Sequence, residues 1–123
     1  MEFELRKQEW KMPKQVWFFL RPQKAQAFGR PVANGFLIRK GSTAMAEGSP
    51  NVKRNRHERN LLLKSGVLVA DSDPDLLRFS QDHVFPSSSL AGGIIKDGNC
   101  SGPQSWKQET DGKTLREFLA TDW

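Results

Sequence analysis

The sequence predicts a single mixed α+β domain, in which a small antiparallel sheet is followed by a helix-hairpin-helix-strand-helix part. Three observations support this fold class. The length of 123 residues suits one hydrophobic core rather than two. Four Trp and eight Phe supply bulky core material, although only 37% of the residues are hydrophobic. Short aromatic and β-branched runs come first, and segments with helix-start signals come later.

The first 46 residues predict a short arm and then the sheet. Residues 1–14 are charged and show no clean period, so we expect an N-terminal arm ahead of a domain over residues 15–123. Strands are expected at residues 15–20, 25–28 and 35–39. We expect Gly29 and Pro31 to interrupt the second strand. The dipeptide Asn34-Gly35 favours a turn that returns the chain into the third strand.

The segment after residue 48 predicts a helix and a hairpin. Ser49-Pro50 is a favoured helix start, and Ser65-Gly66 is a favoured stop, so the first helix is expected between them. Two apolar runs, at residues 67–69 and 76–79, flank a turn that contains three Asp residues. This pattern predicts a hairpin that follows the helix directly.

Two further short helices are expected in the last third of the chain. The hydroxyl groups of residues 87–89 can cap a second helix, which should end at Asp97-Gly98-Asn99. Residues 105–108 read as a strand, and Thr114 as the cap of a last helix that runs through Leu119. The expected domain therefore contains three helices.

The charge of the chain is unevenly distributed. Residues 1–66 carry 14 basic and five acidic side chains, whereas residues 67–123 carry five basic and nine acidic ones, within a net charge of +5. Such asymmetry points to a polyanionic partner for the first half. The alternative is that the two halves attract each other within the folded chain.

A basic run on the first predicted helix is the main candidate binding site. We expect phosphate contacts from Lys53, Arg54, Arg56 and Arg59, with outer support from Arg39, Lys40 and Lys107. At about 100° per residue the charge wraps around the helix. Like charges at this spacing destabilise an isolated helix, and a phosphate partner would relieve that cost. The alternative is a solvated helix face without a partner.

Trp106 is the candidate for base stacking, because it is aromatic and lies next to the basic Lys107. The alternative places Trp106 in the core of a half-buried strand, which the burial tendency of tryptophan favours.

The motifs do not support catalysis or a metal site. His57 and His83 are the only histidines and Cys100 is the only cysteine, so no zinc-type ligand spacing is present. No glycine loop of the P-loop or dinucleotide-binding type occurs. We therefore expect no catalytic residue, no cofactor and no metal. An unrecognised enzyme would need a histidine beside Cys100 or a carboxylate in a cleft.

Composition also predicts a cytoplasmic protein without membrane contact. The longest apolar run, Val16 to Leu20, is five residues long, far short of a membrane span. The first residues lack the basic and apolar regions of a signal peptide. A lone cysteine fits a reducing compartment.

Several segments, taken in order, resemble domain-of-unknown-function family 4357. Residues 35–42, GFLIRKGS, are similar to the GFVVLKGS strand of that family, and residues 79–85, FSQDHVF, to its FTxDYxF segment. Trp106-Lys107 followed by residues 111–115 matches its closing W-K…DGKTL pattern. The likeness covers roughly residues 16–119. One loop departs, because Gly98 stands where the family has a basic residue.

The resemblance implies a link to nucleic acids. The family is often found in bacteria, at the C-terminus of GIY-YIG nucleases. The serine-alanine helix and the tryptophan strand are also similar to the restriction-and-adenine-methylase-associated (RAMA) domain, which is associated with DNA. The chain contains no tyrosine, which a GIY-YIG nuclease domain requires, so we do not expect it to be a nuclease itself.

We therefore expect non-catalytic binding of nucleic acid, DNA rather than RNA, with a nuclease or modification enzyme as a further partner. The alternative is a protein-interaction module, which would use the acidic hairpin of residues 71–82 or the arm with Phe3 and Trp10. The two hypotheses differ in one structural respect. Nucleic-acid binding requires the basic side chains to converge on one face.

Overall fold

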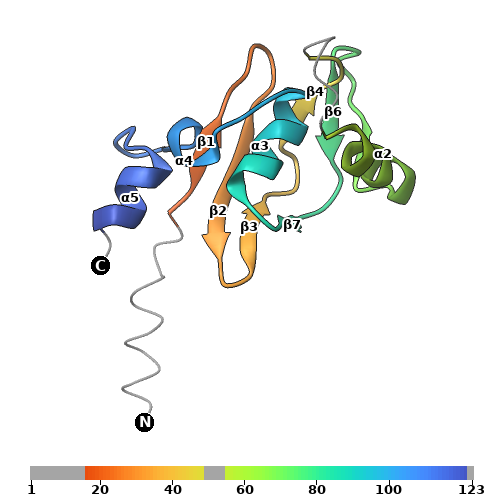
Figure 1. Cartoon of the computed structure of the whole chain (residues 1–123). Helices are drawn as coiled ribbons and strands as arrows, with labels where there is room; N and C mark the ends of the chain where they lie inside the picture. The colour runs from red at the N-terminus through yellow and green to blue at the C-terminus, as the bar shows by residue number, and fades with distance from the viewer. Residues whose placement is uncertain (1–15, 49–54, 122–123) are drawn as a thin grey trace, which may run out of the picture.

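The computed structural model describes residues 16–48 and 55–121 (Figure 1). The predicted arm of residues 1–14 and the predicted helix start at Ser49-Pro50 lie outside these ranges. Over the described residues the chain is one α+β domain with antiparallel sheets, which confirms the expected fold class. The strands are β1 (Phe18–Leu20), β2 (Ala27–Val32), β3 (Gly35–Ile38), β4 (Thr43–Met45), β5 (Leu68–Ala70), β6 (Leu76–Phe79), β7 (His83–Phe85) and β8 (Lys107–Gln108). The helices are α2 (Arg56–Ser65), α3 (Ser88–Lys96), α4 (Gly102–Ser105) and α5 (Leu115–Thr121).

Five of the strands form the larger sheet, in the order β7-β3-β2-β1-β8. The Asn34-Gly35 turn joins β2 to β3 as expected, and Gly35 has a positive φ of 151°. The prediction that Gly29 and Pro31 interrupt the second strand is wrong, because β2 runs through both. Gly29 is needed there, since a Cβ would lie 2.6 Å from the Phe36 ring. Pro31 is tolerated because the pairing of β1 with β2 ends at Gly29.

The other three strands form a second sheet in the order β4-β6-β5. The predicted acidic hairpin is confirmed, since β5 and β6 pair as antiparallel neighbours on either side of the Asp-rich turn. Helix α2 precedes this hairpin and ends at Gly66, which adopts the left-handed conformation typical of a helix stop.

The C-terminal helices follow the predicted capping signals closely. The Ser87 side chain accepts a hydrogen bond of 3.1 Å from the Leu90 N–H at the start of α3. Thr114 and Glu117 bond each other's backbone N–H groups at the start of α5, as in a capping box. One prediction is corrected, because Ser105 belongs to the additional helix α4 and the strand begins only at Lys107. Pro103 in the first turn of α4 favours this helix.

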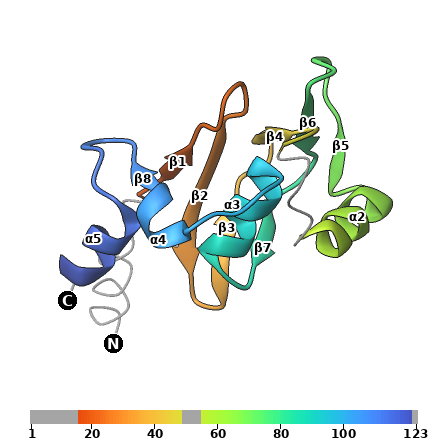
Figure 2. The ribbon, with the colours of Figure 1, turned by 45° about the horizontal axis from the view of Figure 1, so that its top comes forward.

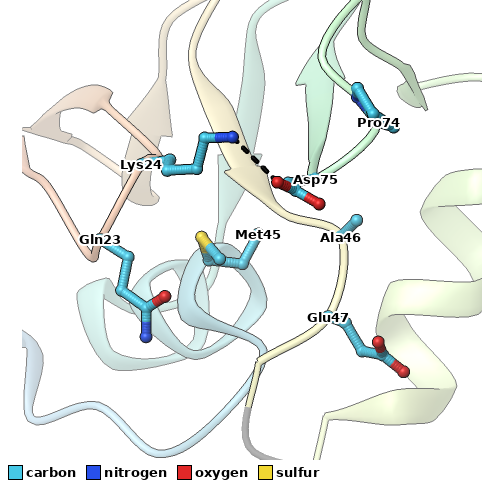
Figure 3. A pocket seen from close by; sticks show the side chains of 7 residues that line it. All are labelled: Gln23, Lys24, Met45, Ala46, Glu47, Pro74 and Asp75. Atoms are coloured by element: carbon cyan, nitrogen blue, oxygen red, sulfur yellow. Dashed lines mark hydrogen bonds and ion pairs between the residues drawn. The ribbon is translucent and has the colours of Figure 1, made fainter.

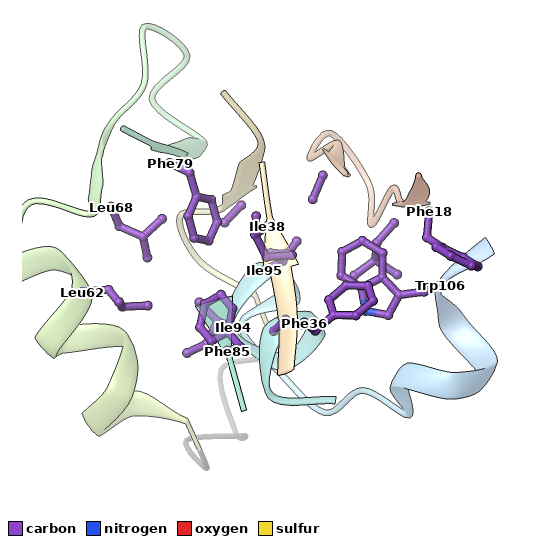
Figure 4. Packing of buried hydrophobic residues seen from close by; sticks show 14 of the residues in the cluster. Phe18, Phe36, Ile38, Leu62, Leu68, Phe79, Phe85, Ile94, Ile95 and Trp106 are labelled. Atoms are coloured by element: carbon purple, nitrogen blue, oxygen red, sulfur yellow. The ribbon is translucent and has the colours of Figure 1, made fainter. Parts of the chain in front are cut away.

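A continuous hydrophobic core joins the two sheets (Figure 4). Trp106, Phe18 and Phe36 fill it at one end, and Phe79 and Leu68 fill it at the other. Helix α3 crosses in front of β2 and β3 in both views, and α4 lies on the same side (Figures 1 and 2). The buried residues of α3 thus cover one face of the larger sheet, whereas α2 packs on β5 of the second sheet.

A buried arginine fastens α2 to the rest of the domain. Arg59 is 2% exposed, and its guanidinium donates hydrogen bonds to the backbone oxygens of Ile94 and Ala46, each at 2.7 Å, and of Met45. Its Nε lies 3.6 Å from Oδ1 of the buried Asp97. Asp97 in turn accepts a 2.9 Å hydrogen bond from the Gly48 N–H. Burial lowers the pKa of Arg59, and the Asp97 carboxylate counteracts this effect.

Replacing Asp97 with Asn should lower the free energy of unfolding by about 3 kcal/mol, because the buried guanidinium loses its compensating charge. Asn tolerates the positive φ of 56° at this position, so the backbone should not change. Urea unfolding measures the loss. The double variant Arg59→Met/Asp97→Asn should lose less than the sum of the two single losses. Equal stability of Asp97→Asn and the parent chain would contradict this account of the pair.

His83 should make the stability depend on pH. Its half-buried ring lies 4.7 Å from the Phe85 ring, and burial lowers its pKa below the ordinary 6.5. The unfolded chain therefore binds this proton more readily, so stability is lost as the pH falls from about 6.5 through the folded pKa. We expect the stability difference between the parent chain and His83→Gln to shrink between about pH 7.5 and about pH 5 in urea unfolding. A difference that stays constant over this range would contradict the prediction.

Candidate nucleic-acid interface

In the described part of the predicted basic helix, the side chains of Arg56 and Arg59 do not form a shared binding surface. Lys53 and Arg54 lie outside the described residues. The prediction that Arg59 contacts phosphate is corrected, because its guanidinium is buried among backbone oxygens and beside Asp97. Arg56 also faces Asp97, with Nη2 at 3.5 Å from Oδ2, although its side chain stays 38% exposed. In the described part of this helix, Arg56 and Arg59 mainly bind groups at the C-terminal end of α3, namely the Ile94 oxygen and the Asp97 carboxylate.

Trp106 does not offer a surface for base stacking. It is 0% exposed, its ring packs 4.8 Å from the Phe36 ring, and its Nε1–H donates a 3.0 Å hydrogen bond to the Ser88 backbone oxygen. The prediction of base contact is therefore corrected in favour of the alternative, a core residue. The reason is that the indole packs between Phe36 of β3 and the start of α3 at Ser88.

The remaining predicted residues lie toward the other face of the larger sheet or next to it. Arg39 follows β3, and its backbone N–H bonds the Phe28 oxygen at 2.9 Å. Lys107 of β8 is exposed and pairs with Phe19 of β1. Lys40 is exposed just after Arg39, where its backbone N–H donates a 2.7 Å hydrogen bond to Asp82.

Strand register brings an aromatic and basic group of side chains together on this face. Phe18, Leu20 and Ile38 point into the core, so their neighbours along each strand point the opposite way. We call this surface the outer face; it consists of Trp17, Phe19, Arg21, Phe28, Arg30, Leu37, Arg39, Val84 and Lys107. The side chains of this group are half-buried or exposed, in contrast to those of the core face.

Three arginines of the outer face lie against its aromatic rings. The Cζ atom of Arg21 is 4.1 Å from the centroid of Phe19. Arg39 lies 4.7 Å from both the Trp17 and the Phe28 rings. Arg30 lies 5.2 Å from Trp17, and its Nε is buried without a hydrogen-bond partner among the described residues. A cation held against a ring in this way is attracted by the negative charge of the ring face.

The cations of the outer face form no ion pair within the described residues. The ion pairs found there involve Lys24, Arg56, Arg59 and Arg78, all on other parts of the surface or inside. The outer face contributes four cationic side chains, and Glu109 is the acidic residue at its β8 edge, where its N–H bonds the Trp17 oxygen at 3.1 Å. The four cationic side chains can therefore attract an anion that extends across the strands of the outer face.

This face was not predicted from the sequence, because residues 15–20 were assigned to a strand without a distinction between its two sides. The sequence does carry a signal for this face, namely that side chains alternate between the two sides of a strand with a period of two residues. Trp17, Phe19 and Arg21 alternate with the buried Phe18 and Leu20. A strand with aromatic residues on both sides predicts a second, partly exposed face.

A pocket of about 290 Å³ lies beside the chain reversal between β1 and β2 (Figure 3). Its lining residues are Gln23, Lys24, Met45, Ala46, Glu47, Pro74 and Asp75. Hydrogen bonds to Asp75 and Asp73, at 2.9 and 3.0 Å from Lys24 Nζ, raise the pKa of Lys24. The Asp75 N–H and then Lys24 hold the pKa of Asp73 below its ordinary value. Lys24 is therefore engaged within the chain, and this single cation does not balance the carboxylates of Asp73, Asp75 and Glu47.

The acidic hairpin of residues 71–82 is engaged in a similar way. Asp71 lies 3.6 Å from the guanidinium of Arg78, and Asp82 accepts the hydrogen bond from Lys40. With Asp73 and Asp75 bound to Lys24, each Asp of this hairpin has a partner in the chain. No observation on this hairpin favours it as a protein-docking surface.

Neither a metal centre nor a membrane span is found in residues 16–48 and 55–121. No three His, Cys, Asp or Glu side chains of these ranges are grouped so that they could hold a metal ion. No helix of these ranges combines the length and the apolar character that crossing a bilayer requires. Cys100 is a half-buried free thiol.

The chain belongs to the family called Domain of unknown function (DUF4357), whose sequence profile matches residues 18–119. The match runs from the start of β1 to Leu119 within α5, and it confirms the resemblance to domain-of-unknown-function family 4357. No curated protein matches the chain, and no solved structure matches it. The family relationship therefore establishes the kind of domain, and the chemistry of the site must come from its own residues.

The burial of Trp106 gives a direct test of its corrected role. Replacing Trp106 with Ala should cost about 3–5 kcal/mol of unfolding free energy, because a fully buried indole leaves a cavity. Urea unfolding measures this loss. A fully folded variant with unchanged stability would contradict the structural role and would return Trp106 to the list of surface candidates.

Proposed function

We propose that the chain is a non-catalytic module that binds nucleic acid, DNA in the first place, through the outer face. The observation that carries this proposal is the set of arginines held against aromatic rings on a sheet face. It replaces the basic helix of the sequence-based hypothesis as the contact surface, with Arg39 and Lys107 common to both.

Ring-backed arginines are suited to phosphate contact. A guanidinium that lies flat on a ring uses its face for that contact and keeps the N–H groups at its edge for hydrogen bonds. Phosphate oxygens accept such forked pairs of hydrogen bonds. Because the rings already limit the freedom of Arg21, Arg30 and Arg39, less conformational entropy is lost on binding.

The absence of acidic partners for these arginines within the described residues also supports the proposal. Arg59, by contrast, is occupied by backbone oxygens and Asp97, and Arg78 and Lys24 by nearby carboxylates. A polyanion approaching the domain therefore meets cations on the outer face that need not leave an existing ion pair. Lys64, Lys96, Lys113 and Arg116 likewise form no ion pair within the described residues, so the outer face is favoured because it groups its cations beside aromatic rings.

The family resemblance adds the biological setting of the proposal. Relatives linked to GIY-YIG nucleases and to RAMA domains suggest that the module helps a bacterial nuclease or modification enzyme to hold DNA in the cytoplasm. This part of the proposal rests on analogy between families rather than on the site.

Fluorescence anisotropy with labelled DNA, from about 50 to about 200 mM salt, tests the proposal. The parent chain should bind with a logarithm of affinity that falls linearly with the logarithm of the salt concentration. The variant Arg30→Gln/Arg39→Gln should bind at least about tenfold more weakly, and its salt slope should decrease by about two, one for each lost phosphate contact.

The matched control is Arg78→Gln/Arg116→Gln, which removes the same charge from exposed arginines outside the outer face. Its affinity should stay close to that of the parent chain. Equal weakening by both double variants would mean that net charge alone drives the binding. No binding by the parent chain at the lowest salt concentration would overturn the proposal.

A further inference from the structure

We infer that the outer face selects single-stranded over double-stranded nucleic acid. This inference rests on the proposed function and specifies its ligand. Besides charge, the outer face offers rings and aliphatic side chains in a defined order across five strands.

The outer face has two rows of side chains that run across the strands. In the first row, Lys107 of β8 lies beside Phe19 of β1, which lies beside Phe28 of β2, and Arg39 follows. In the second row, Arg30 of β2 lies beside Leu37 of β3, which lies beside Val84 of β7. Trp17 stands next to Arg30 and begins this second row.

The aromatic part and the aliphatic part of the outer face are contiguous. The rings of Trp17, Phe19 and Phe28 cover β1 and β2, whereas Leu37 and Val84 continue the apolar surface over β3 and β7. Val84 is 39% exposed, so this surface is open to solvent at the β7 edge. Apolar groups exposed in this way gain free energy only from a ligand that covers them.

A single strand can cover these groups, and a duplex cannot. The bases of a duplex are stacked inside it, so a flat sheet meets only its phosphates and sugars. The bases of a single strand are free to lie on aromatic rings or on the planes of arginine side chains. The rows offer the planes of arginine side chains, because Arg21 lies over Phe19 and Arg39 over Trp17 and Phe28, so a base can stack on the side of the guanidinium that faces away from the ring.

The width of the sheet limits the length of the bound segment. Five strands about 4.8 Å apart span about 19 Å from β8 to β7. Sheet surfaces of this kind stack about two or three bases. Stacking recognises the face of any base, so the site should show little sequence preference.

The experiment compares three labelled probes by fluorescence anisotropy at one salt concentration: an oligothymidylate of about 15 nucleotides, the matching oligouridylate, and a DNA duplex of the same length. At least one of the single strands should bind about tenfold more tightly than the duplex. The tighter of the two single strands then identifies DNA or RNA as the natural ligand.

Two variants separate stacking from charge. Phe19→Leu removes a ring and keeps an apolar side chain, and Val84→Ser removes an exposed apolar side chain that lies outside the core. Val84→Ser should weaken single-strand binding about three- to tenfold and leave both the salt slope and the duplex affinity unchanged. Phe19→Leu also removes the ring behind Arg21, so it should weaken single-strand binding more than duplex binding. Leu61→Ser is the matched control, because Leu61 is 51% exposed and belongs to helix α2, outside the five-stranded sheet; it should change nothing.

Each outcome has a defined meaning. Selective loss of single-strand affinity in Phe19→Leu and Val84→Ser supports the inference. A duplex that binds as tightly as the single strands, together with no effect of these two variants, overturns the inference but leaves the proposed function in place. No binding of any probe by the parent chain overturns the proposed function itself.

Discussion

The contact between the Arg59 guanidinium and three backbone oxygens, completed by the Asp97 carboxylate, decides how this domain is assembled. It lies where helix α2, the end of β4 and helix α3 meet, and it fills a place that an apolar side chain could not fill. The carbonyl groups of Met45, Ala46 and Ile94 would otherwise be buried with unsatisfied hydrogen-bonding capacity at a junction of two sheets. Such a network holds only if every member is present, which ties the small sheet to the large one.

This assembly separates two groups of arginines among the described residues. Arg59 and, in part, Arg56 are held by the protein itself, so the helix that looked most basic in the sequence supplies internal bonds. With α3 and α4 on one face of the five-stranded sheet (Figures 1 and 2), its opposite face keeps Arg21, Arg30 and Arg39 beside aromatic rings. Binding to a polyanion then follows from where the fold leaves cations without carboxylate partners, and less from the number of cations in a segment.

Caps and turns in the sequence predicted where helices and strands lie, but they did not predict which side chains of these elements are buried. The Ser87 cap, the Thr114 capping box, the Asn34-Gly35 turn and the acidic hairpin were readable, since each depends on residues close in sequence. The burial of Arg59 was not readable, because its partners lie 13 to 38 positions away along the chain. The outer face required the pairing of β1 with β8, which joins residues at opposite ends of the domain. Such long-range pairing leaves little trace in one sequence.

The most direct test of the account is a ¹H–¹⁵N NMR titration of the protein with a short single-stranded oligonucleotide, with the indole signals assigned by Trp17→Phe and Trp106→Phe variants. The Trp17 indole lies on the outer face beside Arg30 and Arg39, whereas the Trp106 indole is buried and bonded to Ser88. The account predicts a progressive shift of the Trp17 indole signal and of the amides of β1 and β2, with little change at Trp106 and at the amides of α2. Shifts confined to α2, or no shift at Trp17 under conditions of saturated binding, would contradict it.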